Sequence, residues 1–173
     1  MRRLEAYMRV LMTGFVVILT ASAAFAQQPP APAAAAASRT MVSASDVTAL
    51  IAKAKAERKD NQALLAQSMI QLAPYNVSLE YRAAVANAAV HETEAELFYV
   101  IDGSATLVTG GKLTNENRTN AANLSGSGIE GGVSRRVAKG DFIMVPEGTP
   151  HWFSAIDGTV VLMSLHLPHS PQR

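Results

Sequence analysis

The chain has 173 residues with 15 basic and 14 acidic side chains, a formal net charge of +1 and no cysteine. This length suffices for one domain with a proper core and is short for two. The charge balance leaves no basic patch, so we expect no nucleic-acid partner, and the absence of cysteine excludes thiol catalysis and thiolate metal sites.

Residues 1–26 have the pattern of a secretory signal peptide. Three arginines precede an apolar run over residues 10–26, which ends in Ala24-Phe25-Ala26. Cleavage after Ala26 would leave 12 basic and 13 acidic residues in a periplasmic or secreted protein. An uncleaved membrane anchor is the alternative, although the run is short for a membrane span. We expect contact with the membrane only before cleavage.

The segment that follows predicts a linker and then a helix. Residues 27–42 are rich in Pro and Ala and are typical of a flexible linker. Residues 43–65 predict an N-terminal helix and its connection, with Ser43 and Asp46 in a capping box. Apolar residues then recur at helical spacing: Val47, Leu50, Ile51 and Ala54. We expect an amphipathic helix over about 44–59, packed on the outside of the strands or on a second subunit.

Residues 66–168 have the features of a strand-rich domain. Asp102-Gly103 and Asp157-Gly158 are strong turn signals, and each predicts a hairpin between the segments that flank it. The expected strands are 68–72, 76–83, 96–101, 105–109, 129–137, 142–145, 151–156 and 159–167. Residues 112–128 are polar and predict a long loop, either a lid or disordered. Many short strands behind one helix favour an all-β antiparallel barrel or sandwich, with a tail at 169–173.

Two stretches of this domain carry candidate chemistry. VHETEAELFYVIDG at 90–103 contains His91, Glu96 and Gly103. KGDFIMVPEGTPHW at 139–152 contains Gly140, Pro146, Gly148 and His151. They resemble the two motifs of the cupin family, G-x5-H-x-H-x3,4-E-x6-G and G-x5-P-x-G-x2-H-x3-N, with His91 as the second histidine of the first motif. Three alanines depart from these motifs: Ala83 at the leading glycine, Ala89 at the first histidine and Ala155 at the trailing asparagine.

This resemblance implies a cupin-type β-barrel, a double-stranded β-helix or jelly roll, with a metal inside it. If His91, Glu96 and His151 all point inward, two imidazoles and one carboxylate form a facial ligand set with open positions. Such a set suits divalent iron, manganese, zinc, nickel or copper. The resemblance also implies a small organic ligand and oxygenase, isomerase or decarboxylase activity, and it allows a homodimer. No general base can be assigned.

A barrel that binds a small ligand without metal is the other hypothesis, because an inward Glu can pair with His directly. Phe98, Met144 and Phe153 are candidate pocket residues in either case, although such residues on strands usually form core. His166 could replace the histidine missing at Ala89, but we expect it to face outward or to lie at the rim.

Overall fold

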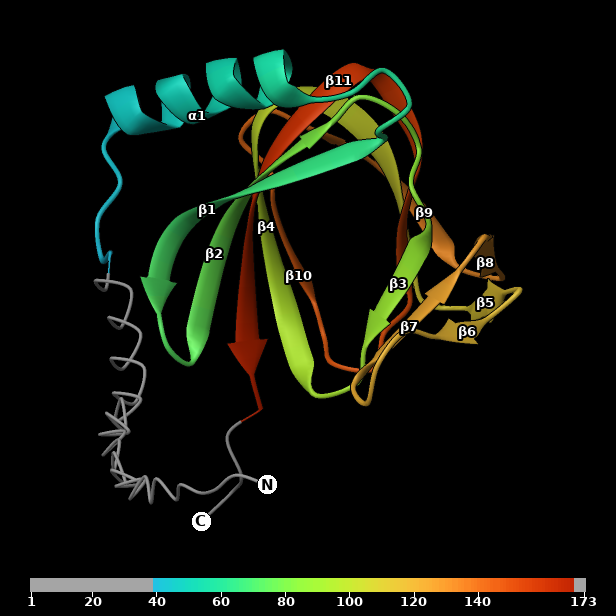
Figure 1. Ribbon diagram of the computed structural model, residues 1–173. Coiled ribbons are helices and arrows are strands. Elements are labelled where there is room, and N and C mark those ends of the chain that lie inside the picture. The colour runs from blue at the N-terminus through green and yellow to red at the C-terminus, as the bar shows by residue number, and fades with distance from the viewer. Residues whose placement is uncertain (1–38, 170–173) are drawn as a thin grey trace, which may run out of the picture. The chain divides into compact units, whose positions relative to one another are not determined.

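The computed structural model describes residues 39–169 (Figure 1). The expected signal peptide and residues 27–38 of the expected linker lie outside the described residues. One helix and eleven strands follow within the described part: α1(Ala44–Glu57), β1(Leu64–Leu72), β2(Tyr75–Arg82), β3(Ala88–His91), β4(Glu94–Thr109), β5(Lys112–Thr114), β6(Asn117–Arg118), β7(Asn123–Gly126), β8(Gly128–Glu130), β9(Val133–Ala138), β10(Phe142–Val145) and β11(His151–Pro168). Nine strands form one antiparallel sheet that curls into a barrel, while β5 and β8 form a second small sheet. The expected all-β antiparallel barrel behind one helix is confirmed.

The helix α1 begins at the expected capping box. Ser43 Oγ accepts from the backbone N–H of Asp46 at 3.1 Å, and Asp46 Oδ2 accepts from the N–H of Ser43 at 3.0 Å. The helix ends at Glu57 because Arg58 has an extended backbone with ψ 130°. The helix lies on the outside of the barrel, as expected (Figure 1). Its apolar face packs against a cluster of buried side chains: Met69, Val77, Leu79 and Val161. Within residues 39–169, no helix is long and apolar enough to cross a membrane.

The two expected Asp-Gly hairpins are wrong. The strands β4 and β11 each run through their Asp-Gly pair and stay paired with one another from Thr109–His151 to Glu94–Pro168. Gly103 and Gly158 have φ of +79° and +72°, which bends the strands without reversing them. A bulge lies at this place, because the pairing steps from Ile156 directly to Val160 on β11.

The barrel core fills the space beside the candidate site. Alternate residues of each strand face inward, and nine of them form one buried cluster: Phe98, Val100, Ala105, Leu107, Val137, Val145, Phe153, Val160 and Leu162. The next inward position beyond Phe98 on β4 is Glu96, and the next one before Phe153 on β11 is His151. The polar site therefore begins where the apolar core ends.

The expected loop over residues 112–128 is also wrong, because the segment forms short strands. The strand β5 pairs with β8, and β7 pairs with β3 so that Asn123 lies opposite His91. These strands have only two to four residues each, which is too short for a period-2 pattern to show in the sequence. The expected strand 129–137 is divided into β8 and β9 at Gly131, whose φ is +71°.

Candidate metal centre

A buried carboxylate forms the middle of the candidate site. Glu96 is 3% exposed, and Ser164 Oγ donates a hydrogen bond to its Oε1. A carboxylate is stable in such a place only when charge or hydrogen bonds compensate its lost hydration. Burial by itself would raise the pKa of Glu96, but the facing imidazoles of His151 and His91 outweigh it and hold the pKa far below its usual value. Glu96 is therefore a buried anion at neutral pH.

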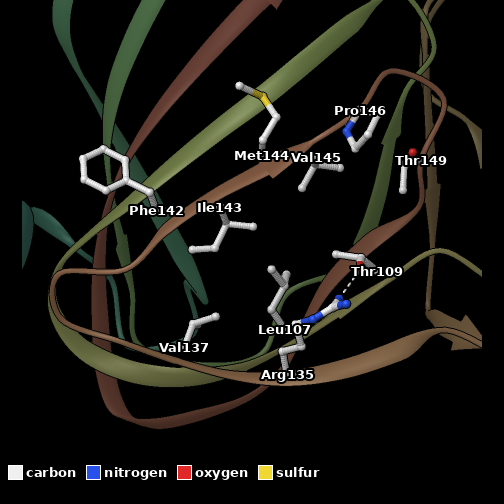
Figure 2. Close-up of a pocket in the computed structure, with 10 residues that line it drawn as sticks. All are labelled: Leu107, Thr109, Arg135, Val137, Phe142, Ile143, Met144, Val145, Pro146 and Thr149. Atoms are coloured by element: carbon white, nitrogen blue, oxygen red, sulfur yellow. Dashed lines mark hydrogen bonds between the residues drawn. The ribbon is translucent and has the colours of Figure 1, made fainter.

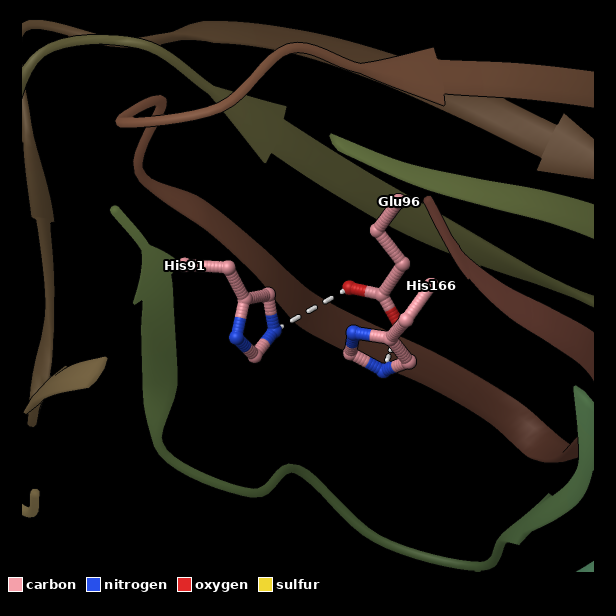
Figure 3. A group of neighbouring side chains, drawn as sticks. All are labelled: His91, Glu96 and His166. Carbon is pink, nitrogen blue, oxygen red and sulfur yellow. Dashed lines mark ion pairs between the residues drawn. The ribbon is translucent and has the colours of Figure 1, made fainter. Parts of the chain in front are cut away.

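Three imidazoles converge on this carboxylate. His91 Nε2 and His151 Nε2 lie 3.3 and 3.1 Å from Glu96 Oε2, so the structure brings the three predicted ligands together. The fourth side chain is His166, whose Nε2 lies 3.4 Å from Glu96 Oε1. Figure 3 shows the rings of His91 and His166 turned toward the carboxylate. The site thus contains three histidines and one glutamate.

The turn of the second motif joins the two motifs. Gly148 has φ +67°, a conformation that favours glycine, and its N–H donates to the carbonyl oxygen of His91 at 2.7 Å. His151 begins β11 three residues later. This turn therefore fixes the backbones of both motif histidines relative to one another.

Each imidazole is oriented from its outer side by an acceptor at Nδ1. The pairs are His91 with Asn123 Oδ1 at 2.7 Å, His151 with the Thr149 carbonyl at 3.3 Å, and His166 with Glu94 Oε2 at 2.9 Å. A carboxylate or carbonyl oxygen can only accept, so the proton lies on Nδ1 in each pair. All three rings then direct Nε2 toward Glu96. Metal-binding histidines in proteins usually have this arrangement.

The donor atoms fit a divalent cation. Glu96 Oε2 is buried, and with the proton of each ring on Nδ1 it accepts no hydrogen bond, although two imidazole nitrogens lie within 3.3 Å of it. An unsatisfied buried acceptor is unfavourable, and a cation bound by the oxygen and the nitrogens would satisfy it. The ligand atoms of His91, Glu96 and His166 lie within 4.8 Å of one another. Nitrogen and oxygen donors of this kind suit first-row transition metals.

The neighbours of His91 also change the pKa of its imidazole. Burial alone would lower the pKa of the His91 imidazole, but Glu96 and Asn123 outweigh burial and raise it. The metal-free site therefore favours a protonated His91 next to an ionised Glu96. A cation that binds there has to displace this proton.

Of the two positions expected for His166, outward or at the rim, the outward one is wrong. Its ring contacts Glu96 and meets the His91 ring edge-on, with centroids 4.8 Å apart. His166 pairs in register with Glu96 across β11 and β4. The sequence concealed this neighbour because the expected hairpin at Asp157-Gly158 separated His166 from the strand that carries His151. Both ends of one bent strand reach the same carboxylate.

Sequence reasoning also missed the residues that support the site. Ser164 lies two positions before His166, and the alternation of inward residues along β11 was the signal that could have identified it. Asn123 lay in the expected loop. Glu94 lies two residues before Glu96 and contacts His166. The other acid near the first motif, Glu92, forms an exposed ion pair with Arg118.

The three predicted pocket residues lie in two places. Phe98 and Phe153 are buried in the barrel core with ring centroids 5.4 Å apart. Met144 is 52% exposed and lines a cavity of about 370 Å³ (Figure 2). The lining of this cavity is largely apolar and contains none of the four cluster residues: Leu107, Thr109, Arg135, Val137, Phe142, Ile143, Met144, Val145, Pro146 and Thr149. Thr149 links the cavity to the cluster, since its carbonyl binds His151.

Comparison with known proteins agrees with this fold. A family model described as Cupin matches residues 55–172. A search of curated proteins found no match. Among solved structures, the chain is similar to a cupin superfamily protein from Desulfitobacterium hafniense DCB-2, with 17% identity over 65% of this chain and 84% of that one and a TM-score of 0.46.

Two further solved structures are similar to this chain. KdgF from Halomonas sp. has 16% identity over 65% of this chain and 86% of that one, with a TM-score of 0.47. The iron(II) form of HppE has 14% identity over 64% of this chain and 54% of that one, with a TM-score of 0.49.

Proposed function

Because the chain belongs to the cupin family, we propose that its barrel binds a divalent metal ion and acts on a small organic ligand. The observation that carries the proposal is the buried Glu96 Oε2, which has no hydrogen-bond donor while the facing rings of His91 and His151 are neutral, although both Nε2 atoms lie within 3.3 Å of it. A cation is the partner that this set of donor atoms fits best.

The proposed ligands are His91, Glu96 and His151. A metal held there would supply Lewis acidity to a bound ligand through its open positions. Glu96 compensates the charge, and Ser164 fixes the carboxylate by its hydrogen bond to Oε1. The buried ring of Phe98 lies 5.9 Å from the His151 ring and keeps water away from the core side of the site. Oxygenation, isomerisation and decarboxylation remain the candidate reactions, with iron, manganese, zinc or nickel as the candidate ions.

Metal content tests this proposal. The full chain is expressed and purified without chelators, and its metal is measured by elemental analysis beside the His91→Ala/His151→Ala double variant. We expect close to one ion per wild-type chain and loss of that ion in the double variant. His169→Ala is the matched control, because His169 pairs with Glu147 and touches none of the proposed ligands. Absence of metal from the wild type, even after exposure to iron, manganese, zinc and nickel, would refute the proposal.

A metal-free ligand-binding barrel is the second candidate function. The observation that favours it is the cavity of about 370 Å³, whose largely apolar lining excludes the four cluster residues. Binding of an apolar fluorescent probe distinguishes this function from the metal-dependent one. Under this second function the probe binds wild type and His151→Ala equally, and a bulky Val137→Trp substitution in the lining abolishes binding.

Export is part of the proposal, supported by the sequence pattern of residues 1–26. Expression of the full chain in a bacterium followed by N-terminal sequencing tests it. A mature chain that begins at Gln27 in the periplasm or the medium is the expected result. A cytoplasmic chain that still begins at Met1 would contradict export.

We also propose a homodimer, supported by aromatic and Met side chains on the outside of β10. Phe142 and Met144 are 70% and 52% exposed, and the Phe142 ring contacts Tyr99 with centroids 4.6 Å apart. Sedimentation of wild type beside Phe142→Glu tests this proposal. A dimer that becomes monomeric in the variant is expected, and a monomeric wild type would refute it.

A further inference from the structure

This chain lacks one histidine of the family motif. Ala89 stands where the first motif of the family has its first histidine. It shares a face of β3 with His91 and pairs in register with His151. An alanine methyl group cannot bind a metal, so a centre built only from the two motifs has one imidazole fewer than the motif provides.

A third imidazole nevertheless reaches the cluster from another strand. His166 Nε2 lies 3.4 Å from Glu96 Oε1, on the other oxygen from the one that His91 and His151 approach. Its donor atoms and those of His91 and Glu96 lie within 4.8 Å of one another, a spacing that one ion can bridge.

The orientation of His166 is fixed independently of Glu96. Glu94 Oε2 accepts from His166 Nδ1 at 2.9 Å, so the proton lies on Nδ1 and the Nε2 lone pair faces the cluster. Carboxylate–histidine pairs of this kind commonly support metal ligands and increase the basicity of the binding nitrogen. The ring is also half-buried, which limits its other orientations.

We propose that His166 replaces the imidazole missing at position 89, so that three histidines and one glutamate hold the ion. This inference rests on the proposed metal centre and adds a ligand that the motifs do not contain. The four ligands come from β3, β4 and the two ends of β11. The ion would therefore connect the end of β11 to β3, and metal binding would stabilise that end of the strand.

The alternative is that His166 only stabilises the fold through Glu94 and Glu96. The two roles differ in what they predict. A structural His166 affects the stability of the metal-free protein and leaves metal affinity unchanged. If His166 is a metal ligand, its removal weakens the metal affinity itself. A histidine introduced at position 89 should then restore that affinity.

The test transfers the ligand between the two positions. The dissociation constant of zinc is measured by chelator competition in the full chain and in His166→Ala, Ala89→His/His166→Ala and His169→Ala. We expect His166→Ala to weaken binding by more than about 100-fold, beyond the roughly 10–100-fold effect of losing an outer hydrogen bond. The double variant should regain at least about tenfold of this loss, and His169→Ala should match wild type.

Hydrogen exchange gives a second readout that needs no activity. Zinc should protect the amides of residues 163–167 in wild type and leave them unprotected in His166→Ala. The absorption of the cobalt(II)-loaded protein should also change when His166 is removed. Circular dichroism checks the fold of each metal-free variant, and His166→Gln takes the place of His166→Ala if the alanine variant does not fold.

The outcomes separate this inference from the proposed function. If wild type binds zinc, the His91→Ala/His151→Ala variant loses it and His166→Ala retains wild-type affinity, the metal centre stands and the role of His166 is refuted. If wild type binds no metal, the proposed function itself fails. Loss of affinity in His166→Ala with recovery in the double variant supports both.

Discussion

The barrel buries two glutamates on its inner face, and they have different partners. Glu80 on β2 is 8% exposed and lies 2.7 Å from the Arg82 guanidinium, which also stacks over the Phe153 ring. Glu96 on β4 is 3% exposed, and its Oε2 faces two imidazole nitrogens at 3.3 and 3.1 Å. Both pair across to β11, at Leu162 and His166. The same barrel therefore contains a charge neutralised within the protein and a charge whose neighbours suit a cation.

This comparison assigns different roles to the two carboxylates. A guanidinium is permanently charged and satisfies a carboxylate with fixed donors, so the Glu80–Arg82 pair needs no further partner. Imidazoles are neutral or charged near pH 7 and bind metals when neutral. The pair at Glu80 belongs to the fold, and the cluster at Glu96 belongs to the proposed function.

The largest expected effect is the loss of metal in Glu96→Gln. The substitution keeps the size of the side chain and removes the charge that compensates the ion. We expect metal affinity to fall by more than about 100-fold, since loss of a ligand should exceed loss of its support. Chelator competition measures the change. Wild-type affinity in this variant would contradict the assigned role of Glu96.

The matched substitution Glu80→Gln should affect stability and leave metal binding unchanged. It leaves the buried Arg82 without its counter-charge, which costs about 3–5 kcal/mol in comparable buried pairs. Urea unfolding of the metal-free protein measures the loss. Glu92→Gln, which breaks the exposed pair with Arg118, is the control and should leave the unfolding midpoint unchanged. Weaker metal binding in folded Glu80→Gln would remove the distinction between the two carboxylates.

A smaller effect is expected from Asn123→Ala. Asn123 Oδ1 accepts from His91 Nδ1 at 2.7 Å and so orients the ring, but Asn123 is not itself a proposed ligand. Metal affinity should fall by about 10–100-fold, the usual result of losing such support. Asn117→Ala on β6, an exposed position, is the control and should bind metal like wild type. Equal affinity in the two variants would show that the hydrogen bond does not affect the site.

The smallest expected effect is on the pH dependence of stability. Its sign should differ between the metal-free and the zinc-bound protein. The pKa of His91 is raised in the folded protein, so its contribution to stability is present below its ordinary value of about 6.5 and is lost as pH rises through the folded value. The metal-free protein should lose this contribution as the pH rises through the raised pKa of His91. Added zinc should stabilise the protein more as pH rises, because binding requires neutral imidazoles.

Thermal unfolding from pH 6 to pH 8, with and without zinc, measures both slopes. The lowered pKa of Glu96 does not interfere, because Glu96 contributes stability above its ordinary pKa and loses it only in acid. His91→Ala should flatten the slope of the metal-free protein. Identical slopes with and without zinc would contradict the account.

Sequence reasoning identified the residues that lie within the two motifs. His91, Glu96 and His151 are brought together as expected, because motif spacing reflects local strand and turn geometry. The helix start at Ser43 was also predictable, since a capping box is a local signal. These features depend on residues close together in the chain.

The sequence did not reveal what depends on pairing between distant strands. His166 and Ser164 approach Glu96 only because β11 passes through Asp157-Gly158 and pairs with the start of β4. Asn123 reaches His91 because a four-residue strand pairs with β3. Asp-Gly is a common turn sequence, and the backbone of Gly103 and Gly158 serves a bulge equally well.

The most direct test of the central claim is a calorimetric metal titration of stripped wild type, Glu96→Gln and Glu80→Gln at the same pH. We predict that wild type and Glu80→Gln each bind one ion per chain, and that Glu96→Gln binds it more than about 100-fold more weakly. Equal binding by all three proteins, or no binding of iron, manganese, zinc or nickel by wild type, would contradict it.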